Sequence, residues 1–193
     1  MRAGGTFRTL GGAFLLLALA VPPAEAKVFV TVDEALRLAF PGCQLERRTA
    51  FLTPEQKRRA GELAGGEIPS ALVNFQVATC GGKPGGTAWF DTHRVRTLPE
   101  TLLVVVDPAA KVARIEVVSF REPQDYLPRD AWYAQFLHRG LDPDLDLKRA
   151  IRPVTGATLT ANATLAAVRR VLALHQVLFP PPPTAAPPPK AKP

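Results

Sequence analysis

The segment from Ser70 to Phe120 limits the possible folds more than any other part of the chain, because β-rich runs follow one another there with only turn signals between them. The connections include a glycine-rich loop at 81–86 and a turn at 107–111, and both are too short to hold a crossover helix. Alternating apolar and polar side chains predict strands at residues 70–78 and 112–120, the chain is expected to continue as a strand at 87–95, and a β-rich run predicts a strand at 102–106. The segment therefore predicts an antiparallel meander and not a parallel sheet that alternates with helices.

Helix signals flank this meander on both sides. The clearest start is Thr53-Pro54-Glu55-Gln56, where Thr53 is the expected N-cap, Pro54 takes the first helical position and Gln56 completes a capping box. Helices are predicted at residues 32–40, 54–63, 129–139, 145–150 and 160–178, and a short strand at 27–31. The expected fold class is α+β, an antiparallel β-meander sheet packed with helices.

The first 26 residues have the pattern of a secretory signal peptide. Arg2 and Arg8 precede an apolar run at 11–21, and Ala24-Glu25-Ala26 is a suitable cleavage site. An uncleaved anchor is the alternative. Residues 27–179 are then expected to form one domain, and the proline-rich residues 180–193 a disordered tail. The chain is expected to be exported, either periplasmic or associated with a membrane on its periplasmic side.

Charge and histidine usage exclude several classes of function. The formal net charge is +7, but the basic residues are scattered without interleaved aromatic residues, so a nucleic-acid partner is not expected. A basic surface instead favours an anionic membrane or an acidic redox partner. His93, His138 and His175 show no ligand spacing, and no hydrolase or protease motif is present, so neither a metal site nor catalytic residues are predicted.

The chain has two cysteines, Cys43 and Cys80. An even pair in an exported protein predicts one disulfide, and two separate buried thiols are the alternative. Neither cysteine belongs to a CxxC or CxxCH motif, so thioredoxin-like chemistry and covalent haem attachment have no basis in the sequence.

Small residues and hydroxyls gather in the segment 153–160, where the last long helix is predicted to begin. Unpaired backbone N–H groups and the positive end of the helix dipole meet at such a point, which favours a bound phosphate. The alternative is ordinary helix capping, above all for the hydroxyl of Thr160.

The core of this segment, Thr155-Gly156-Ala157-Thr158, resembles the flavin-attachment motif of the FMN-binding domain family, which includes subunits of the Na⁺-translocating quinone reductase and of Rnf complexes. The resemblance extends to the meander and to an aromatic segment at 132–140. It implies that Thr158 carries FMN through a phosphoester bond. Arg152 departs from the family's pattern, which usually has aspartate there, so non-covalent flavin remains an alternative.

The resemblance also implies the rest of a cofactor site and a function. The expected cofactor-binding residues are Thr155, Gly156, Ala157, Thr158, Leu159, Thr160 and Glu122. Glu122 is expected to lie near the flavin or to hold its loop, with a solvated turn carboxylate as the alternative. Trp89, Tyr126 and Trp132 are candidates to shield the flavin ring, although buried aromatic residues mostly belong to the core.

The implied function is that of an exported electron-transfer flavoprotein rather than a substrate-converting enzyme. It would relay electrons between redox partners, such as a membrane electron-transport complex or a cytochrome, and a flavin transferase would attach its FMN. The alternatives are an exported module that binds another phosphate ligand and a structural subunit without flavin.

Overall fold

The computed structural model describes residues 27–180, so the predicted signal peptide and residues 181–193 of the predicted tail lie outside the described residues. The fold is α+β, as predicted, with an antiparallel sheet in the order β1-β6-β5-β4-β3-β2. Its strands are β1 (Lys27–Val28), β2 (Gln44–Phe51), β3 (Leu72–Cys80), β4 (Lys83–Arg94), β5 (Pro99–Val106) and β6 (Val112–Phe120). The helices are α1 (Val32–Ala39), α2 (Pro54–Ala64), α3 (Asp130–Tyr133) and α4 (Thr158–Leu178), with short 3₁₀ helices η1 (Gln124–Tyr126) and η2 (Ala134–Phe136).

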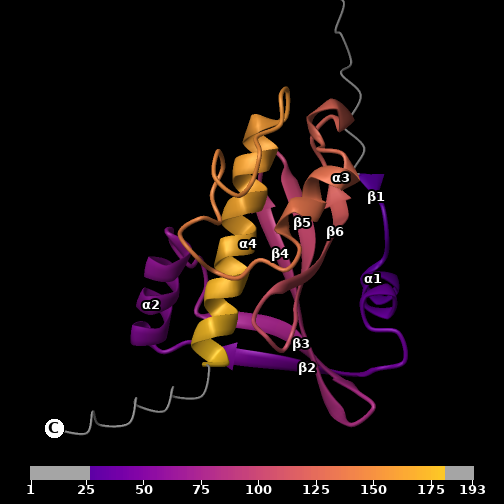
Figure 1. Cartoon of the computed structure of the whole chain (residues 1–193), viewed down its shortest axis with the longest axis vertical. Coiled ribbons are helices and arrows are strands. Elements are labelled where there is room, and N and C mark those ends of the chain that lie inside the picture. The colour runs from indigo at the N-terminus through magenta and orange to yellow at the C-terminus, as the bar shows by residue number, and fades with distance from the viewer. Residues whose placement is uncertain (1–26, 181–193) are drawn as a thin grey trace, which may run out of the picture.

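Helices cover both faces of the sheet (Figure 1). Successive side chains of a strand point to opposite faces, so the apolar run of β5 supplies two cores. Leu102 and Val104 pack with α2 and α4 in the larger cluster, whereas Leu103 and Val105 pack with α1 in the smaller one. A strand buried on both faces explains why β5 reads as a continuous apolar run.

The long helix α4 crosses the sheet beside α2 (Figure 1). Most of its alanine, valine and leucine side chains are buried, and Arg169 on its edge donates to the carbonyls of Leu63, Ala64, Asp142 and Leu145. These bonds join α4 to the end of α2 and to the loop 141–157. The middle of α4 is thereby fixed relative to α2 and to this loop.

The edge strand β2 was not predicted. Its residues are almost all exposed and show no apolar alternation, so the sequence carries no strand signal. Pairing with β3 along its whole length, from Gln44 opposite Thr79 to Phe51 opposite Leu72, decides its conformation.

The glycine-rich loop expected at 81–86 is much shorter in the structure. Gly81 and Gly82 alone form the turn, and β4 already begins at Lys83. Gly86 lies within the strand at φ +112°, and a Cβ atom there would collide with the carbonyl of Val106. The glycines of this run thus allow close backbone approach as well as the turn.

Of the helices predicted in the second half of the chain, one is too long and another is wrong. The helix predicted at 129–139 is limited to α3 and η2, which end at Phe136. The helix predicted at 145–150 is absent, and turns occupy the segment. The Asp142 carboxylate accepts from the backbone of Asp144 and Leu145, a local bond that competes with helix formation.

The predicted disulfide is present between Cys43 and Cys80. It joins the loop after α1 to the end of β3 and is typical of a protein of a non-reducing compartment. Between residues 27 and 180, no helix combines the length and hydrophobicity that a membrane crossing requires.

Candidate functional site

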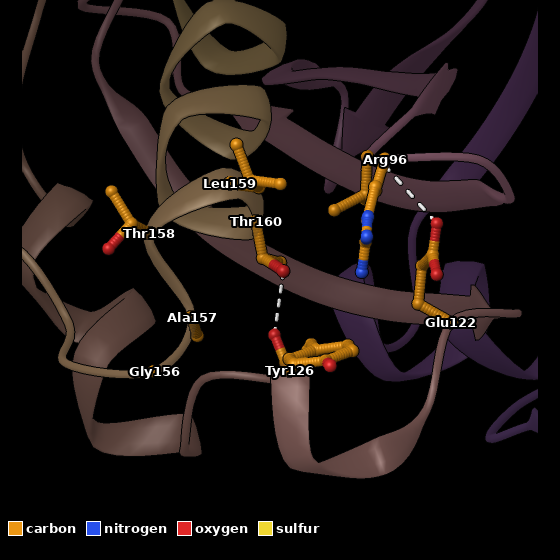
Figure 2. A pocket seen from close by; sticks show the side chains of 9 residues that line it. Arg96, Glu122, Tyr126, Gly156, Ala157, Thr158, Leu159 and Thr160 are labelled. Atoms are coloured by element: carbon orange, nitrogen blue, oxygen red, sulfur yellow. Dashed lines mark hydrogen bonds between the residues drawn. The ribbon is translucent and has the colours of Figure 1, made fainter.

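The predicted motif residues lie around one small cavity at the start of α4 (Figure 2). Its volume is about 190 Å³. It is lined by Val95, Arg96, Glu122, Tyr126, Gly156, Ala157, Thr158, Leu159 and Thr160. Of the expected cofactor-binding residues, Thr155 alone is not in this lining. The structure therefore brings Glu122 from the end of β6 to the motif, although more than 30 residues separate them in sequence.

The first turn of α4 has no side-chain cap. Ala157 is the N-cap residue and offers no acceptor, and the first helical bond is donated by Ala161 to Ala157. Within the described chain, the backbone N–H groups of Thr158, Leu159 and Thr160 have no hydrogen-bond partner. Unpaired donors and the helix dipole make this end attractive to an anionic group.

Glycine at position 156 permits the turn that leads into α4. Gly156 has φ +83°, a conformation that other residues rarely adopt, and no atom lies within 4 Å of an added Cβ. The backbone of Gly156 is therefore open to close approach at this turn.

Glu122 is buried, with 6% of its surface exposed, and holds the loop that follows β4. Its Oε1 accepts from the backbone N–H groups of Arg96, Thr97 and Leu98, at 3.3, 2.6 and 2.7 Å. Figure 2 shows the first of these bonds. Burial by itself raises the pKa of Glu122, but these hydrogen bonds outweigh burial and hold the pKa below its usual value. Glu122 is therefore a charged loop anchor, and the alternative of a solvated turn carboxylate is wrong.

Arg96 is a pocket residue that the sequence analysis missed. Its side chain reaches down beside Glu122 toward Thr160 (Figure 2). It is exposed, and no ion pair is formed by its guanidinium group within residues 27–180. An arginine in a turn has no distinguishing sequence signal, so only the fold places it here.

The two motif hydroxyls that line the cavity differ in availability. Thr160 is fully buried, and its Oγ1 donates to the carbonyl of Tyr126 at 2.6 Å. It is thus not a helix cap, and its hydroxyl hydrogen is not free for a phosphate. Thr158 is exposed, with only a long contact of 3.5 Å from its Oγ1 to the carbonyl of Val154. In Figure 2 its hydroxyl lies on the opposite side of the helix start from Glu122.

The three candidate aromatic residues differ in whether they lie in the core or at the cavity. Trp89 and Trp132 are core residues, whose indole N–H groups donate to Thr87 Oγ1 and to the carbonyl of Arg152. Tyr126 lines the cavity and is 39% exposed. Of the three candidates, only Tyr126 offers a surface to a ligand.

A chain of ionisable side chains, some fully and some partly buried, lies between α4 and the sheet. Arg170 donates to both oxygens of Asp91 at 2.7 and 2.8 Å, and His93 bonds Asp91 at 2.9 Å and Glu100 at 3.0 Å. The hydroxyl of Tyr133 makes a long bond of 3.5 Å to Glu100. No carboxylate partner was predicted for His93, since its contact with Glu100 depends on the pairing of β4 with β5.

The contacts of His93 predict that the free energy of unfolding falls as the pH rises through the mildly alkaline range. Burial alone lowers the pKa of His93, but hydrogen bonds and charge from Asp91 and Glu100 outweigh it and raise the pKa from 6.5 to about 9. The folded state therefore binds the extra proton between these values, so this contribution is complete below pH 6.5 and lost as the pH rises through about 9. Urea unfolding across this range measures the effect.

His93→Gln is the control for this titration, since glutamine keeps a hydrogen-bonding group but cannot be protonated. The slope of the unfolding free energy against pH is expected to flatten between pH 6.5 and about 9 in this variant. An unchanged slope would assign the pH dependence to other groups.

Comparisons with known proteins give no further identification. No protein-family model matches the chain, and neither a curated protein nor a solved structure is significantly similar to it. The resemblance to the FMN-binding domain family therefore rests on the sequence motif and its surroundings.

Proposed function

We propose that this chain is an exported electron-transfer flavoprotein that carries FMN through a phosphoester to Thr158. The observation that carries the proposal is the convergence of Glu122 and residues 156–160 on one cavity at an uncapped helix start. The disulfide between Cys43 and Cys80 supports export, because such bonds persist mainly in oxidising compartments.

The residues present fit a flavin phosphate at the helix start. Three unpartnered N–H groups, at Thr158, Leu159 and Thr160, face no competing acceptor in the described chain. Gly156 leaves space for close approach, and Arg96 adds a free positive charge at the cavity. A phosphate held there would be stabilised by hydrogen bonds, the helix dipole and a cation together.

Thr158 is the residue suited to covalent attachment. Its hydroxyl is exposed beside Gly156 and Ala157, where a flavin transferase can reach it. Its Oγ1 would lose its proton and form the bond to the phosphorus of the FMN half of FAD, and AMP would leave with the bonding electrons of the broken phosphoanhydride.

Other residues of the cavity would bind and orient the cofactor, whose flavin ring supplies the redox chemistry when bound. The cavity of about 190 Å³ is smaller than the roughly 300–1,000 Å³ of whole ligand sites, so it suits one end of a larger ligand. Tyr126 and Leu159, which are 39% and 53% exposed, add apolar surface at the edge of the cavity for the rest of the ligand. The second oxygen of Glu122 has no partner in the described residues and can accept from an N–H or O–H of the ligand.

The test is the intact mass of protein purified from the export compartment of a host with a competent flavin transferase, measured after denaturation. The unsubstituted protein is expected to carry the added mass of one FMN, and Thr158→Ala is expected to lose that mass completely. Thr155→Ala is the matched control, since it removes a neighbouring hydroxyl that does not line the cavity, and it should keep the added mass.

Three other outcomes decide between the alternatives. Yellow protein of unmodified mass would replace covalent by non-covalent flavin. An added FMN that persists in Thr158→Ala would move the attachment to another residue. Colourless, unmodified protein would overturn the flavoprotein proposal and leave an exported module that binds another phosphate ligand or has a structural role.

A further inference from the structure

The sheet is split between β3 and β4. Their ladder ends at the pair Gln76–Ala88, although residues 72–75 of β3 and 89–94 of β4 lie beyond this pair. Along these stretches β3 stays paired with β2, and β4 stays paired with β5. Figure 1 shows β2 and β3 turning away from β4 and β5. The two halves of the sheet therefore diverge, and each leaves an inner strand edge without a neighbouring strand.

The gap between these edges holds a pocket of about 250 Å³, which we call the β3–β4 slot. Successive strand residues point to opposite faces of a sheet, so a pocket on one face is lined by every second residue. The slot is instead lined by consecutive residues of both strands, 72–74 and 89–92, so it lies between the strands. The rest of its lining comes from the segment before β3 and from α4: Ile68, Pro69, Ser70, Arg170, Val171 and Leu174.

The pairing of β3 shows which of its main-chain groups face the slot. In an antiparallel pair, alternate residues of a strand direct their N–H and C=O groups to the same neighbour. The N–H of Leu52 donates to the carbonyl of Ala71 at 2.8 Å, so the odd-numbered residues of β3 bond β2. The even-numbered residues point the other way, and Gln76 lies in the pair with Ala88. Asn74 therefore directs its N–H and C=O groups into the slot.

The same alternation applies to β4. Since Ala88 directs its main-chain groups to β3, Phe90 and Thr92 direct theirs to this side as well. Neither these groups nor those of Asn74 have a hydrogen-bond partner within residues 27–180. Main-chain donors and acceptors of folded proteins are nearly always paired, with protein or with water. The slot is thus an incomplete ladder with open groups on both of its sides.

The side chains of the slot suit an uncharged ligand. Among its lining residues only Asp91 and Arg170 are charged, and they neutralise each other through bonds of 2.7 and 2.8 Å. Val171 and Leu174 of α4 form an apolar wall. An extended peptide places every second side chain on one face, where this wall can contact it. The charge and the hydrogen-bonding pattern of the slot are therefore complementary to an extended, uncharged peptide.

We propose that the β3–β4 slot binds an extended, uncharged segment of a partner protein as an added strand. The segment bonds Phe90 and Thr92 on one side and Asn74 on the other, so it joins the two halves of the sheet. Strand addition to an open sheet edge is a common mode of peptide recognition, in which main-chain bonds supply affinity. The slot shares no lining residue with the cavity at the start of α4, so this binding is independent of flavin.

The test is a nuclear magnetic resonance titration of the intact, ¹⁵N-labelled protein with a capped heptapeptide of alternating threonine and valine. Backbone signals are expected to shift at residues 72–76 and 88–94 and to stay in place at residues 156–160. At saturation, the amide hydrogens of Phe90 and Thr92 should exchange with solvent about tenfold more slowly or less, because the added strand bonds them.

Two substitutions at one position separate the main-chain bond from the side chain. Thr92→Pro removes the N–H that faces the slot and no bond to β5, and it should raise the Kd about tenfold. Thr92→Val is the matched control. It removes the hydroxyl, which bonds the hydroxyl of Thr101 at 2.9 Å, but keeps the N–H, so the Kd should not change.

A second measurement changes the peptide and leaves the protein intact. N-methylation of the three valines removes donors of the peptide's own main chain, and it should weaken binding about tenfold or more. This comparison decides alone where the spectrum of Thr92→Pro lacks the dispersion of a folded protein.

Three results would overturn the proposal: shifts confined to other parts of the chain, equal Kd values for Thr92→Pro and Thr92→Val, or unchanged binding of the N-methylated peptide. Absence of any shift at millimolar peptide would also overturn it and would assign the open groups of the slot to water. Colourless protein that binds the peptide in the slot would overturn the proposed function and keep this site.

Discussion

The variant Asp91→Asn is expected to lower the free energy of unfolding by about 3–5 kcal/mol, the usual cost of removing one partner from a buried ion pair. The Asp91 side chain is 11% exposed and accepts from Arg170 on α4 and from His93 on its own strand. Asparagine has nearly the same shape but no charge. It would therefore leave Arg170, whose side chain is 17% exposed, without its carboxylate partner, and His93 with Glu100 alone.

Urea unfolding at neutral pH measures this effect, and Glu46→Gln is the matched control. Glu46 also pairs with an arginine, Arg48, but both side chains are largely exposed, so no measurable change is expected. Equal effects of the two substitutions would show that the contacts of Asp91 with His93 and Arg170 contribute no more to the free energy of unfolding than a surface ion pair.

The double variant Cys43→Ser/Cys80→Ser is expected to lower the free energy of unfolding by about 3–4 kcal/mol. The disulfide closes a loop with a sequence separation of 37 residues, and removing it gives the unfolded chain more conformational freedom. The affected region is the smaller core, where both cysteines pack beside α1.

Reductant provides the control for the disulfide. It should lower the stability of the unsubstituted protein toward that of the variant and leave the variant itself unchanged. Equal stability of the variant and the oxidised protein would show that strain in the folded state cancels the effect of the cross-link.

Local signals predicted much of the secondary structure. The capping box at Thr53 and Gln56 is present with both of its hydrogen bonds, because it depends on residues three positions apart. The strands of the meander were predicted from alternation and β-rich runs, and α4 from apolar residues that recur on one broad helix face. These elements carry their own signal within a few residues.

The candidate site was predicted in part. Glycine, hydroxyls and a helix start at 153–160 identified the motif, and the cavity contains most of its residues. The state of each hydroxyl was not predictable, because the bond from Thr160 to Tyr126 spans 34 residues. Arg96 was missed for the same reason, since its place depends on the loop that Glu122 anchors.

The sequence by itself determined the α+β class, the antiparallel meander, the start of α2 and the pairing of the two cysteines. Each follows from short-range periodicity, capping chemistry or the count of a rare residue. Only the tertiary structure decided that β2 is a strand, that His93 lies between Asp91 and Glu100, and that Arg96 and Glu122 line one cavity with the start of α4. These features depend on contacts between distant segments, and burial and pairing energies set them once the sheet and α4 have packed.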